Sequence, residues 1–427
     1  MADVSIRRTD FLRGEINAPP SKSYTHRMLI AAFLSKGKTK IEKPLVSDDT
    51  LATLGAIKAF GAKVKTHANF WEIEGQIPPK TPCKPVDCSE SGATLRFMIP
   101  IAALAPSPTT FLMGPSLSRR PIMPLLQSLE KLGIKTYYRT EEPTRVRILG
   151  GRLKGGKTAL RGDISSQFIS GLLFACPLAQ EKTEIALTTS IESKTYIQMT
   201  EEILNKHGVK VSISEDFRTL QVPGNQAYKP CSHTVPGDFS STAYILAAAA
   251  ITSSKIKIKN LNHNTRQGDK AILQVLKNAG LEVKVNKETV EVQGELSKAI
   301  NIDAKDVPDL VPACSAMACY TRGTSKIYNA KRLRYKESDR LTAVCTELKK
   351  MGADIHLERD SLTIKGACTM RGATIDPHND HRIAMMCAAV ALGAEGETRI
   401  INAECVRKSY PTFFRDLHVL GANIVGG

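Results

Sequence analysis

The chain has 427 residues, too many for one ordinary core and suited to two or three domains. Apolar residues make up 42% and charged residues 24%, which excludes a disordered or fibrous protein. The most apolar stretch, residues 244–251, is far shorter than the ~18 to 20 residues that cross a bilayer, so a membrane span is excluded.

Charge and cysteine content narrow the function classes further. Lys and Arg exceed Asp and Glu by 59 to 42, a net charge of +17, which fits nucleic acid, an anionic surface or polyanionic small substrates as partners. Aromatic residues are only 5%, so small substrates are favoured over nucleic acid. The amino-terminal sequence lacks the apolar core of a secretory signal, and the ten cysteines contain no CxxC pair. We therefore expect a cytoplasmic protein without disulfides or a metal site.

A sixfold repeat runs along the whole chain. Six glycines follow the predicted ends of helices, with 69 to 75 residues between neighbours: Gly61, Gly133, Gly208, Gly280, Gly352 and Gly421. Such a glycine is typical of the left-handed residue that closes a helix. After it the sequence alternates like a strand, as in residues 63–67, 282–286 and 354–358. We predict six units of about 70 residues, packed three to a domain, with the break near residues 235–237.

A further helix opens about 40 residues before each of these glycines. The residues at its start are of types that cap helices: Ser21 and Ser23, Ser91, Ser165 and Ser166, Ser240 and Ser241, Asp309, and Asp380. Helix N-termini also attract anions, so converging openings would form an anion site. The alternative is that these residues only cap helices, and for Ser240 and Ser241 the two interpretations are about equally supported.

Motifs with polar and basic residues stand at these openings in the first half of the chain. In PPSKSYTHR, Ser23 and Arg27 lie four residues apart, on one helical face with Lys22 nearby. In SGATLR, Gly92 would let a ligand reach the backbone, and Arg96 follows one turn later. The remaining candidates are Arg119 and Arg120 in SRRPI, Ser165, Ser166 and Gln167 in ISSQF, and Ser193 and Tyr196 in SKTY.

The second half adds acidic residues to this pattern. Asp309 stands at a helix start in DVPD, and RYKESDRL places Lys336, Glu337 and Arg340 within about one helical turn, which could also be a solvated, salt-bridged face. NDHR brings Asp380, His381 and Arg382 to the start of an apolar helix. Lys408 in RKSYP completes the set.

These strings occur in the order seen in the 5-enolpyruvylshikimate-3-phosphate synthases, and the chain resembles that family over essentially its whole length. The resemblance implies an α/β monomer of two similar inside-out α/β barrel domains, each of three repeats of about 70 residues, with the active site in the cleft between them. The first domain would be residues 17–235, and the second would combine residues 1–16 with 236–427.

The reaction implied by the resemblance transfers the enolpyruvyl group of phosphoenolpyruvate to the 5-hydroxyl of shikimate 3-phosphate and releases phosphate, without a metal or organic cofactor. The residues implied for shikimate 3-phosphate are Lys22, Ser23, Arg27, Ser165, Ser166, Gln167, Ser193, Tyr196, Asp309 and Lys336. Those implied for phosphoenolpyruvate are Lys22, Gly92, Arg120, Gln167, Arg340, Arg382 and Lys408. Gly92 also suggests sensitivity to glyphosate.

The chemistry needs cations and two groups that move protons. Both substrates carry a carboxylate and a phosphate, so their repulsion must be offset by converging cations. The hydroxyl loses a proton while C3 of phosphoenolpyruvate gains one. We take Asp309, with Lys22, as the acceptor of the hydroxyl proton and Glu337 as the donor to C3.

Two departures from the family pattern put single contacts in question. Glu90 and Ala93 flank Ser91-Gly92 where the family commonly has Asn and Thr, and Arg332 stands where some members have an asparagine that contacts the shikimate ring.

Two alternatives remain open at this point. One is the sister enolpyruvyl transferase acting on UDP-N-acetylglucosamine, which usually carries a loop cysteine where this chain has Pro115. The other is a nucleic-acid protein related to the RNA 3′-phosphate cyclases, for which no nucleotide-binding loop is recognisable.

Overall fold

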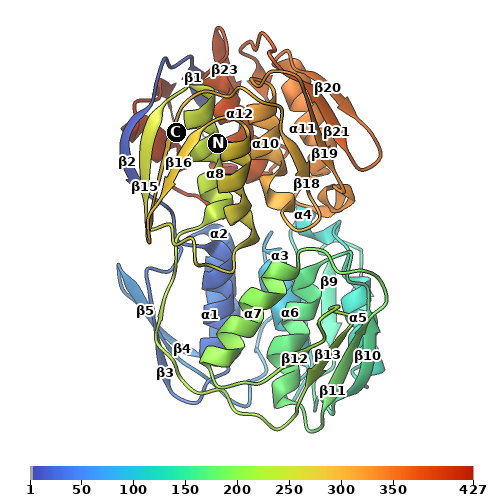
Figure 1. Ribbon diagram of the computed structural model, residues 1–427. Coiled ribbons are helices and arrows are strands. Elements are labelled where there is room, and N and C mark those ends of the chain that lie inside the picture. Colours follow the sequence, from blue (N-terminus) through green and yellow to red (C-terminus); the bar gives the residue numbers. More distant parts are fainter. Residues whose placement is uncertain (1–2, 427) are drawn as a thin grey trace. The chain divides into compact units, whose positions relative to one another are not determined.

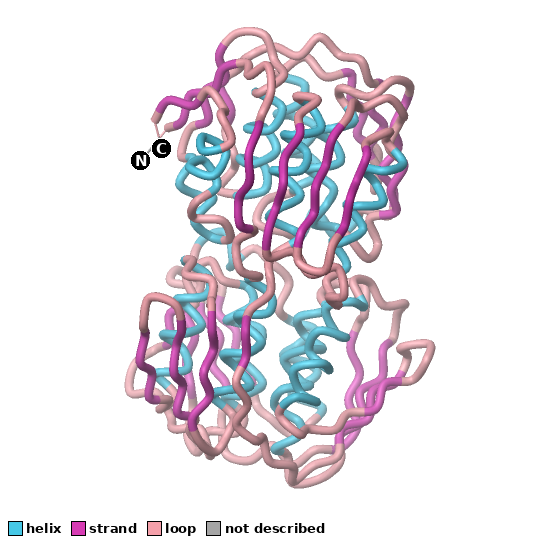
Figure 2. The backbone as a smooth tube through the Cα atoms, turned by 60° about the vertical axis from the view of Figure 1, so that its left-hand side comes forward, coloured by secondary structure: helices cyan, strands magenta, loops and turns pink. Residues whose placement is uncertain are grey.

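The computed structural model describes residues 3–426, and the chain divides into two compact units, Pro20–Val235 and a second unit made of Met1–Pro19 with Pro236–Gly427. We call them the 20–235 unit and the 236–427 unit. In each unit, helices lie inside and strands outside (Figures 1 and 2). The prediction of an α/β architecture with buried helices and outer sheets is confirmed.

The 20–235 unit has three buried helices, α1 (Lys22–Phe33), α3 (Gly92–Ala102) and α6 (Ser166–Ala175). Its other helices are α2 (Asp48–Ala59), α4 (Pro115–Ser118), α5 (Met123–Lys131), α7 (Lys194–Lys206) and the 3-10 turn η1 (Cys176–Leu178). Its sheets have the orders β14-β3-β5-β4, β6-β7-β9-β8 and β10-β11-β13-β12. The strands are β3 (Lys38–Glu42), β4 (Lys63–Thr66), β5 (Phe70–Glu74), β6 (Val86–Asp87), β7 (Thr109–Leu112), β8 (Thr136–Arg139), β9 (Arg145–Ile148), β10 (Gly156–Leu160), β11 (Thr183–Leu187), β12 (Ser212–Ile213), β13 (Thr219–Val222) and β14 (His233–Thr234).

The 236–427 unit repeats this plan around α8 (Phe239–Ile251), α10 (Val311–Ala318) and α12 (His381–Ala391). Its other helices are α9 (Ile272–Asn278), α11 (Arg340–Lys350), α13 (Phe413–Val419) and the 3-10 turns η2 (Gly268–Ala271), η3 (Pro308–Leu310), η4 (Lys331–Tyr335) and η5 (Ala403–Lys408). Its sheets have the orders β16-β17-β15-β2, β18-β19-β21-β20 and β22-β23-β1-β24. The strands are β1 (Val4–Arg7), β2 (Arg13–Asn17), β15 (Lys255–Lys259), β16 (Glu282–Val285), β17 (Thr289–Gln293), β18 (Asn301–Asp303), β19 (Thr324–Tyr328), β20 (Asp354–Leu357), β21 (Leu362–Lys365), β22 (Thr374–Ile375), β23 (Glu397–Ile400) and β24 (Ile424–Val425).

The central helices are buried on almost every side, as expected of helices that other elements surround. In α8 every residue from Phe239 to Ala250 is buried, and its run of alanines lets α10 and α12 pack closely against it. In the 20–235 unit the equivalent contact is between α3 and α6, where Gly171 lies against the backbone of Arg96. Each unit therefore has one core, built from helix–helix contacts and closed by sheets.

The six predicted helix-closing glycines follow α2, α5, α7, α9, α11 and α13, with φ between +75° and +110°. This confirms both the sixfold repeat and the left-handed conformation predicted for these glycines. The strands predicted after Gly61, Gly280 and Gly352 are β4, β16 and β20.

The predicted helix caps are confirmed at Ser21, Ser91, Ser165 and Asp380, but not at Ser23 and Ser166, which lie inside the first turns of α1 and α6. The prediction is wrong for Ser240 and Ser241, which lie in the first turn of α8, because Asp238 is the cap and accepts from the Ser241 amide at 2.7 Å. It is also wrong for Asp309. That residue lies inside η3, and its carboxylate binds cations instead of capping α10.

The amino-terminal segment takes part in two sheets of the 236–427 unit. β1 lies between β23 and β24, and β2 pairs in parallel with β15. A boundary after residue 16 would cut β2, which continues to Asn17, and the chain leaves this unit only after Pro19.

Candidate functional site

The starts of α3 and α6 meet the link between α4 and α5 around Gly92, the first residue of α3. A Cβ atom added to Gly92 would lie 3.2 Å from Arg120 Nη1, 3.4 Å from Arg96 Nη1 and 3.6 Å from Gln167 Oε1. Arg96 Nη1 donates to Gln167 Oε1 at 2.7 Å, which joins α3 to the start of α6. We call Gly92, Arg96, Arg120 and Gln167 the Gly92 cluster. Two guanidinium groups and an amide surround the position that a side chain would fill, an arrangement suited to an oxyanion.

Glu90 supports the segment that leads to Arg120. Its carboxylate accepts from the amides of Ser116 (3.1 Å) and Leu117 (2.8 Å) at the start of α4. Gly114 lets the carboxylate approach, since a Cβ there would lie 2.6 Å from Glu90 Oε1. Glu90, which departs from the family pattern, thus fixes the backbone of the segment before Arg120.

Lys22 lies in the first turn of α1 and forms an ion pair with Asp49 of α2, with 2.9 Å between Nζ and Oδ2. A chain of hydroxyl contacts runs from Thr53 of α2 through Thr94 to Ser91 at the cap of α3, with distances of 2.6 and 2.7 Å. Thr94 also donates to the Asp49 carbonyl at 3.4 Å, so the partner of Lys22 lies beside the first turn of α3. Asp49 was not identified from the sequence, because nothing local marks it as the partner of Lys22.

Arg27 is buried one turn further along α1. Its guanidinium donates to Thr200 Oγ1 (2.9 Å), to the Ser23 carbonyl (2.9 Å) and to the Tyr196 carbonyl (3.0 Å). Burial lowers the pKa of Arg27 to about 10, so it remains a cation at neutral pH. Arg27 thus joins α1 to α7.

The hydroxyl residues predicted for this unit lie at the starts of α6 and α7. Ser165 caps α6 and Ser166 begins it, and both are buried. Ser193 precedes α7 in the left-handed conformation, with φ +55°, and is 1% exposed. The Tyr196 ring centre lies 5.7 Å from Arg27 Cζ. The structure thus brings Arg27, Ser193 and Tyr196 to one end of α7.

In the 236–427 unit a second charged group is organised around Asp309. Lys336 Nζ and Arg340 Nη1 contact Asp309 Oδ1 at 3.2 and 3.0 Å, and Arg382 Nη2 lies 3.3 Å from Oδ2. Burial alone would raise the pKa of Asp309, but Arg382, Lys336 and Arg340 hold that pKa well below its usual range. Asp309 is therefore a carboxylate at neutral pH.

Arg340 ties this group together from the first turn of α11. It is fully buried and contacts Glu337 Oε2 at 2.5 Å and Asp380 Oδ2 at 2.9 Å in addition to Asp309. We call Asp309, Lys336, Glu337, Arg340, Asp380 and Arg382 the Asp309 cluster. A guanidinium that binds three carboxylates keeps a fixed orientation.

Lys336 and Arg340 do not share a helix, which corrects the predicted helical turn. Lys336 is extended after η4, and α11 begins only at Arg340 with Asp339 as its cap. Burial lowers the pKa of Lys336 to about 8; Asp309 opposes this shift, and Arg340 and Arg332 add to it. Arg332, which departs from the family pattern, is buried in η4.

The start of α12 supplies two more predicted cations. Arg382 also donates to the Asp309 carbonyl at 3.2 Å. Lys408 of η5, which is 7% exposed, donates to the carbonyl of Asn379 at 2.6 Å, next to the Asp380 cap. The residues predicted in the second half thus lie at the starts of α10 and α12 or contact residues there. Glu337 is the exception, since it contacts Arg340.

Asp269 of η2 is a buried carboxyl that sequence reasoning missed. It accepts from the Ser240 hydroxyl, and burial together with the charge of Asp309 raises its pKa to about 7. No local pattern marks it, because Ser240, its contact in α8, lies 29 residues away.

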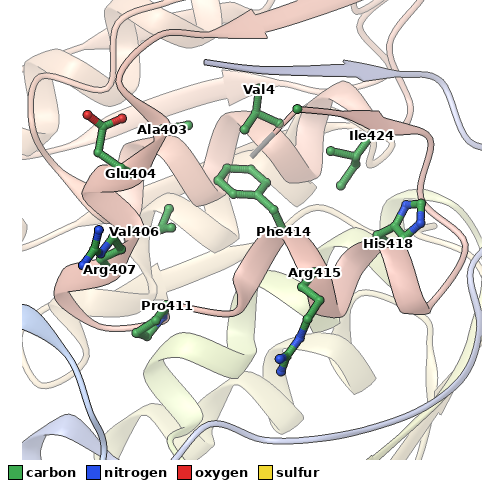
Figure 3. Close-up of a pocket in the computed structure, with 11 residues that line it drawn as sticks. Val4, Ala403, Glu404, Val406, Arg407, Pro411, Phe414, Arg415, His418 and Ile424 are labelled. Carbon is green, nitrogen blue, oxygen red and sulfur yellow. The ribbon is translucent and has the colours of Figure 1, made fainter. Parts of the chain in front are cut away.

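A separate cavity of about 510 Å³ lies in the 236–427 unit beside α13 (Figure 3). Its lining includes Val4, Phe414, Arg415, His418 and Ile424 and contains none of the predicted site residues. Within residues 3–426, no helix combines the length and the apolar character needed to cross a membrane.

Comparison with known proteins identifies the family. The model of the family EPSP synthase (3-phosphoshikimate 1-carboxyvinyltransferase) matches residues 6–417. A 3-phosphoshikimate 1-carboxyvinyltransferase of Methanocaldococcus jannaschii is 41% identical over 98% of this chain and 98% of its own length. One of Methanocella arvoryzae is 45% identical over 96% of this chain and 97% of its own.

A solved structure of the same family has the same fold. The EPSP synthase of Acinetobacter baumannii superposes with a TM-score of 0.81 at 25% identity, covering 100% of both chains. Neither the sister transferase nor a nucleic-acid protein is favoured by these matches. The chain belongs to the EPSP synthase family and is an enolpyruvyl transferase of the shikimate pathway.

Proposed function

We propose that the Gly92 cluster and the Asp309 cluster bind one pair of substrates together, phosphoenolpyruvate and shikimate 3-phosphate. Phosphoenolpyruvate contacts Lys22, Gly92, Arg120, Gln167, Arg340, Arg382 and Lys408. Shikimate 3-phosphate contacts Lys22, Ser23, Arg27, Ser165, Ser166, Gln167, Ser193, Tyr196, Asp309 and Lys336. The observation that carries the proposal is the position beside Gly92, where a Cβ would lie within 3.6 Å of both Arg120 and Gln167.

Electrostatics supports this division of residues. Each substrate brings a carboxylate and a phosphate, so their mutual repulsion must be offset by cations held in place before binding. Arg340 and Arg382 are buried and are fixed by carboxylates of their own unit. Fixed guanidinium groups lose little side-chain entropy when an anion binds.

The reaction uses Asp309 and Glu337 as the groups that move protons. Asp309, with Lys22, accepts the proton of the 5-hydroxyl as that oxygen bonds to C2 of phosphoenolpyruvate, while Glu337 donates a proton to C3. Phosphate then leaves C2, and the methyl group returns a proton to Glu337. The low pKa of Asp309 supports the charged form that can accept a proton. Bound substrate anions would offset the cations that depress this pKa and so make Asp309 a stronger base.

Phosphate release on mixing both substrates is the direct test. Wild-type enzyme should release phosphate only when both substrates are present. Glu337→Gln should lower kcat by about 10² to 10⁴, whereas Asp339→Asn, in the same loop but exposed, should keep normal turnover. Near-normal turnover in Glu337→Gln would remove Glu337 from the mechanism.

The chain is also proposed to act in the cytoplasm as a monomer without a cofactor. All ten cysteines are free thiols, which suits a reducing compartment. The monomeric state rests on the family resemblance, and light scattering on the purified protein tests it.

A further inference from the structure

A hollow of about 350 Å³ lies on the outer face of sheet β6-β7-β9-β8. It is lined by Thr110 of β7, Tyr137 and Arg139 of β8, and Arg145 and Arg147 of β9. Residues alternate along these strands, so Val146 and Ile148 face the core while Arg145 and Arg147 face outward. We call this site the arginine hollow. It contains none of the residues assigned to the two clusters.

Strand register brings its cations together. Arg139 and Arg145 are paired directly across β8 and β9, and Tyr137 pairs with Arg147. Thr110 pairs with Arg147 on the other side of β9. Like charges directly opposite each other destabilise a strand pair, so this arrangement has a cost unless an anion is present.

The corresponding strand pairs of the other repeats show which charges face each other elsewhere in the chain. In the corresponding strand pairs, Lys63 faces Glu74, Lys284 faces Glu291, and Asp354 faces Lys365. The pairs β12–β13 and β1–β24 carry no charged residues opposite each other. Among the described residues, β8–β9 is therefore the strand pair of this type with two facing cations.

No described residue neutralises the cations of the arginine hollow. Within residues 3–426, Arg139, Arg145 and Arg147 have no side-chain hydrogen bond or ion pair, and no carboxylate lines the hollow. The turn between the strands carries Glu141 and Glu142, but neither belongs to the lining. The fold thus presents three convergent guanidinium groups to solvent.

We propose that the arginine hollow binds a small, multiply charged phosphate compound, such as a pyrophosphate or a phosphate monoester. Guanidinium groups bind phosphate oxygens in pairs, so three of them around one hollow suit a ligand with two or more negative charges. Tyr137, which is 54% exposed, offers its hydroxyl as a further donor at the rim. The volume accommodates a small molecule.

The test uses pyrophosphate as the probe and thermal unfolding of the full chain as the readout. The variants are Arg145→Gln and, as a second change in the hollow, Arg147→Gln. Lys65→Gln is the matched control, since it removes one exposed cation opposite Glu72 from the same unit. Any pyrophosphate bound by the active site raises the melting temperature of all four proteins alike, so only differences between them report on the hollow.

At low salt without multivalent anions, Arg145→Gln should melt at or above the wild-type temperature, because a repulsive pair is removed. Pyrophosphate should raise the melting temperature of wild type and Lys65→Gln by more than that of either hollow variant, corresponding to an affinity at this site about tenfold lower in the variants. Turnover should stay at the wild-type value in all three variants.

Equal responses of wild type and both hollow variants would overturn the proposal. A single-stranded oligonucleotide serves as the second probe at the same ionic strength. A response to it that depends on Arg145, with none to pyrophosphate, would also overturn the proposal and assign the surface to nucleic acid.

Discussion

Arg340 and Asp380 form an ion pair from which water is excluded: Arg340 Nε lies 2.9 Å from Asp380 Oδ2, and neither side chain has exposed surface. Asp380 Oδ1 also accepts from the Arg382 amide at 3.0 Å. One carboxylate therefore orients a guanidinium and caps the helix that carries Arg382. The positions of these two arginines depend on each other through Asp380.

Replacing Asp380 by Asn should lower the free energy of unfolding by about 3 to 5 kcal/mol, because fully buried Arg340 would lose the one carboxylate partner that is itself fully buried. Asn caps helices as well as Asp does, so the loss reports on the charge and not on the cap. Urea denaturation measures the change. Asp339→Asn is the control, since Asp339 caps α11 and pairs with Arg334 at the surface, and it should cost only about 0 to 1 kcal/mol. Equal losses in the two variants would contradict this account.

Gly92→Ala should raise KM for phosphoenolpyruvate and weaken inhibition by glyphosate, each by about tenfold to a hundredfold, since the new methyl group displaces Arg120 or the ligand. Steady-state kinetics checks both values. Gly55→Ala is the control, because Gly55 lies within α2 and an added Cβ would contact nothing within 4 Å. This control should stabilise the protein by about 0.5 to 1 kcal/mol without changing KM. An unchanged KM in Gly92→Ala would show that the space beside it is not used.

The buried pair His207 and His233 should make the 20–235 unit sensitive to acid. Their Nε2 atoms lie 2.8 Å apart, and burial lowers the pKa to about 4 for His207 and about 3 for His233. Both folded-state values lie below the unfolded value of about 6.5, so the unfolded chain binds more protons. Stability is complete above pH 6.5 and should fall below it, by roughly 1.4 kcal/mol per pH unit for each histidine.

Fluorescence of Trp71 reports on this unit, because Trp71 is the single tryptophan of the chain and is buried in β5. Urea denaturation from pH 7 to 4.5 gives the slope. His233→Gln should flatten the slope, and His356→Gln, at an exposed position, should not. The same slope in His233→Gln and wild type would rule out the pair as its source.

We expect shikimate 3-phosphate to bind more weakly at alkaline pH because Lys336 loses its charge there. Its pKa is lowered to about 8 by burial, so the free enzyme loses this cation as the pH rises through 8. KM for shikimate 3-phosphate should therefore increase between pH 7 and 9.5. In Lys336→Arg, which keeps the charge, KM for shikimate 3-phosphate should not increase over this pH range. In Lys350→Arg, which alters a lysine paired with Glu347, the increase should remain. An increase of KM with pH that persists in Lys336→Arg would show that another group causes it.

Local signals in the sequence were sufficient for the repeat and for most helix ends. Gly61 and its five equivalents close helices through a positive-φ conformation that glycine adopts most readily, and Ser91 or Asp380 caps a helix through contacts two or three residues away. Residues of this kind can be recognised without knowing the fold.

Partners brought together by the tertiary structure could not be recognised in this way. Asp49 meets Lys22 from 27 residues away, and Asp238 caps α8 while the Ser240 hydroxyl in its first turn donates to Asp269, 29 residues away. Lys336 and Arg340 were expected on one helix from their spacing, but both contact Asp309 while Lys336 is extended and α11 begins only at Arg340.

The pairing of β2 with β15 sets an order of events during synthesis. Arg13, the first residue of β2, leaves the ribosome 242 residues before Lys255, its partner. The interval is longer for β1, because its partners β23 and β24 lie near the other end of the chain. The 20–235 unit can complete its core in the meantime, so the nascent chain must keep its first strands unpaired, and exposed to chaperones or to other chains, until translation is almost finished.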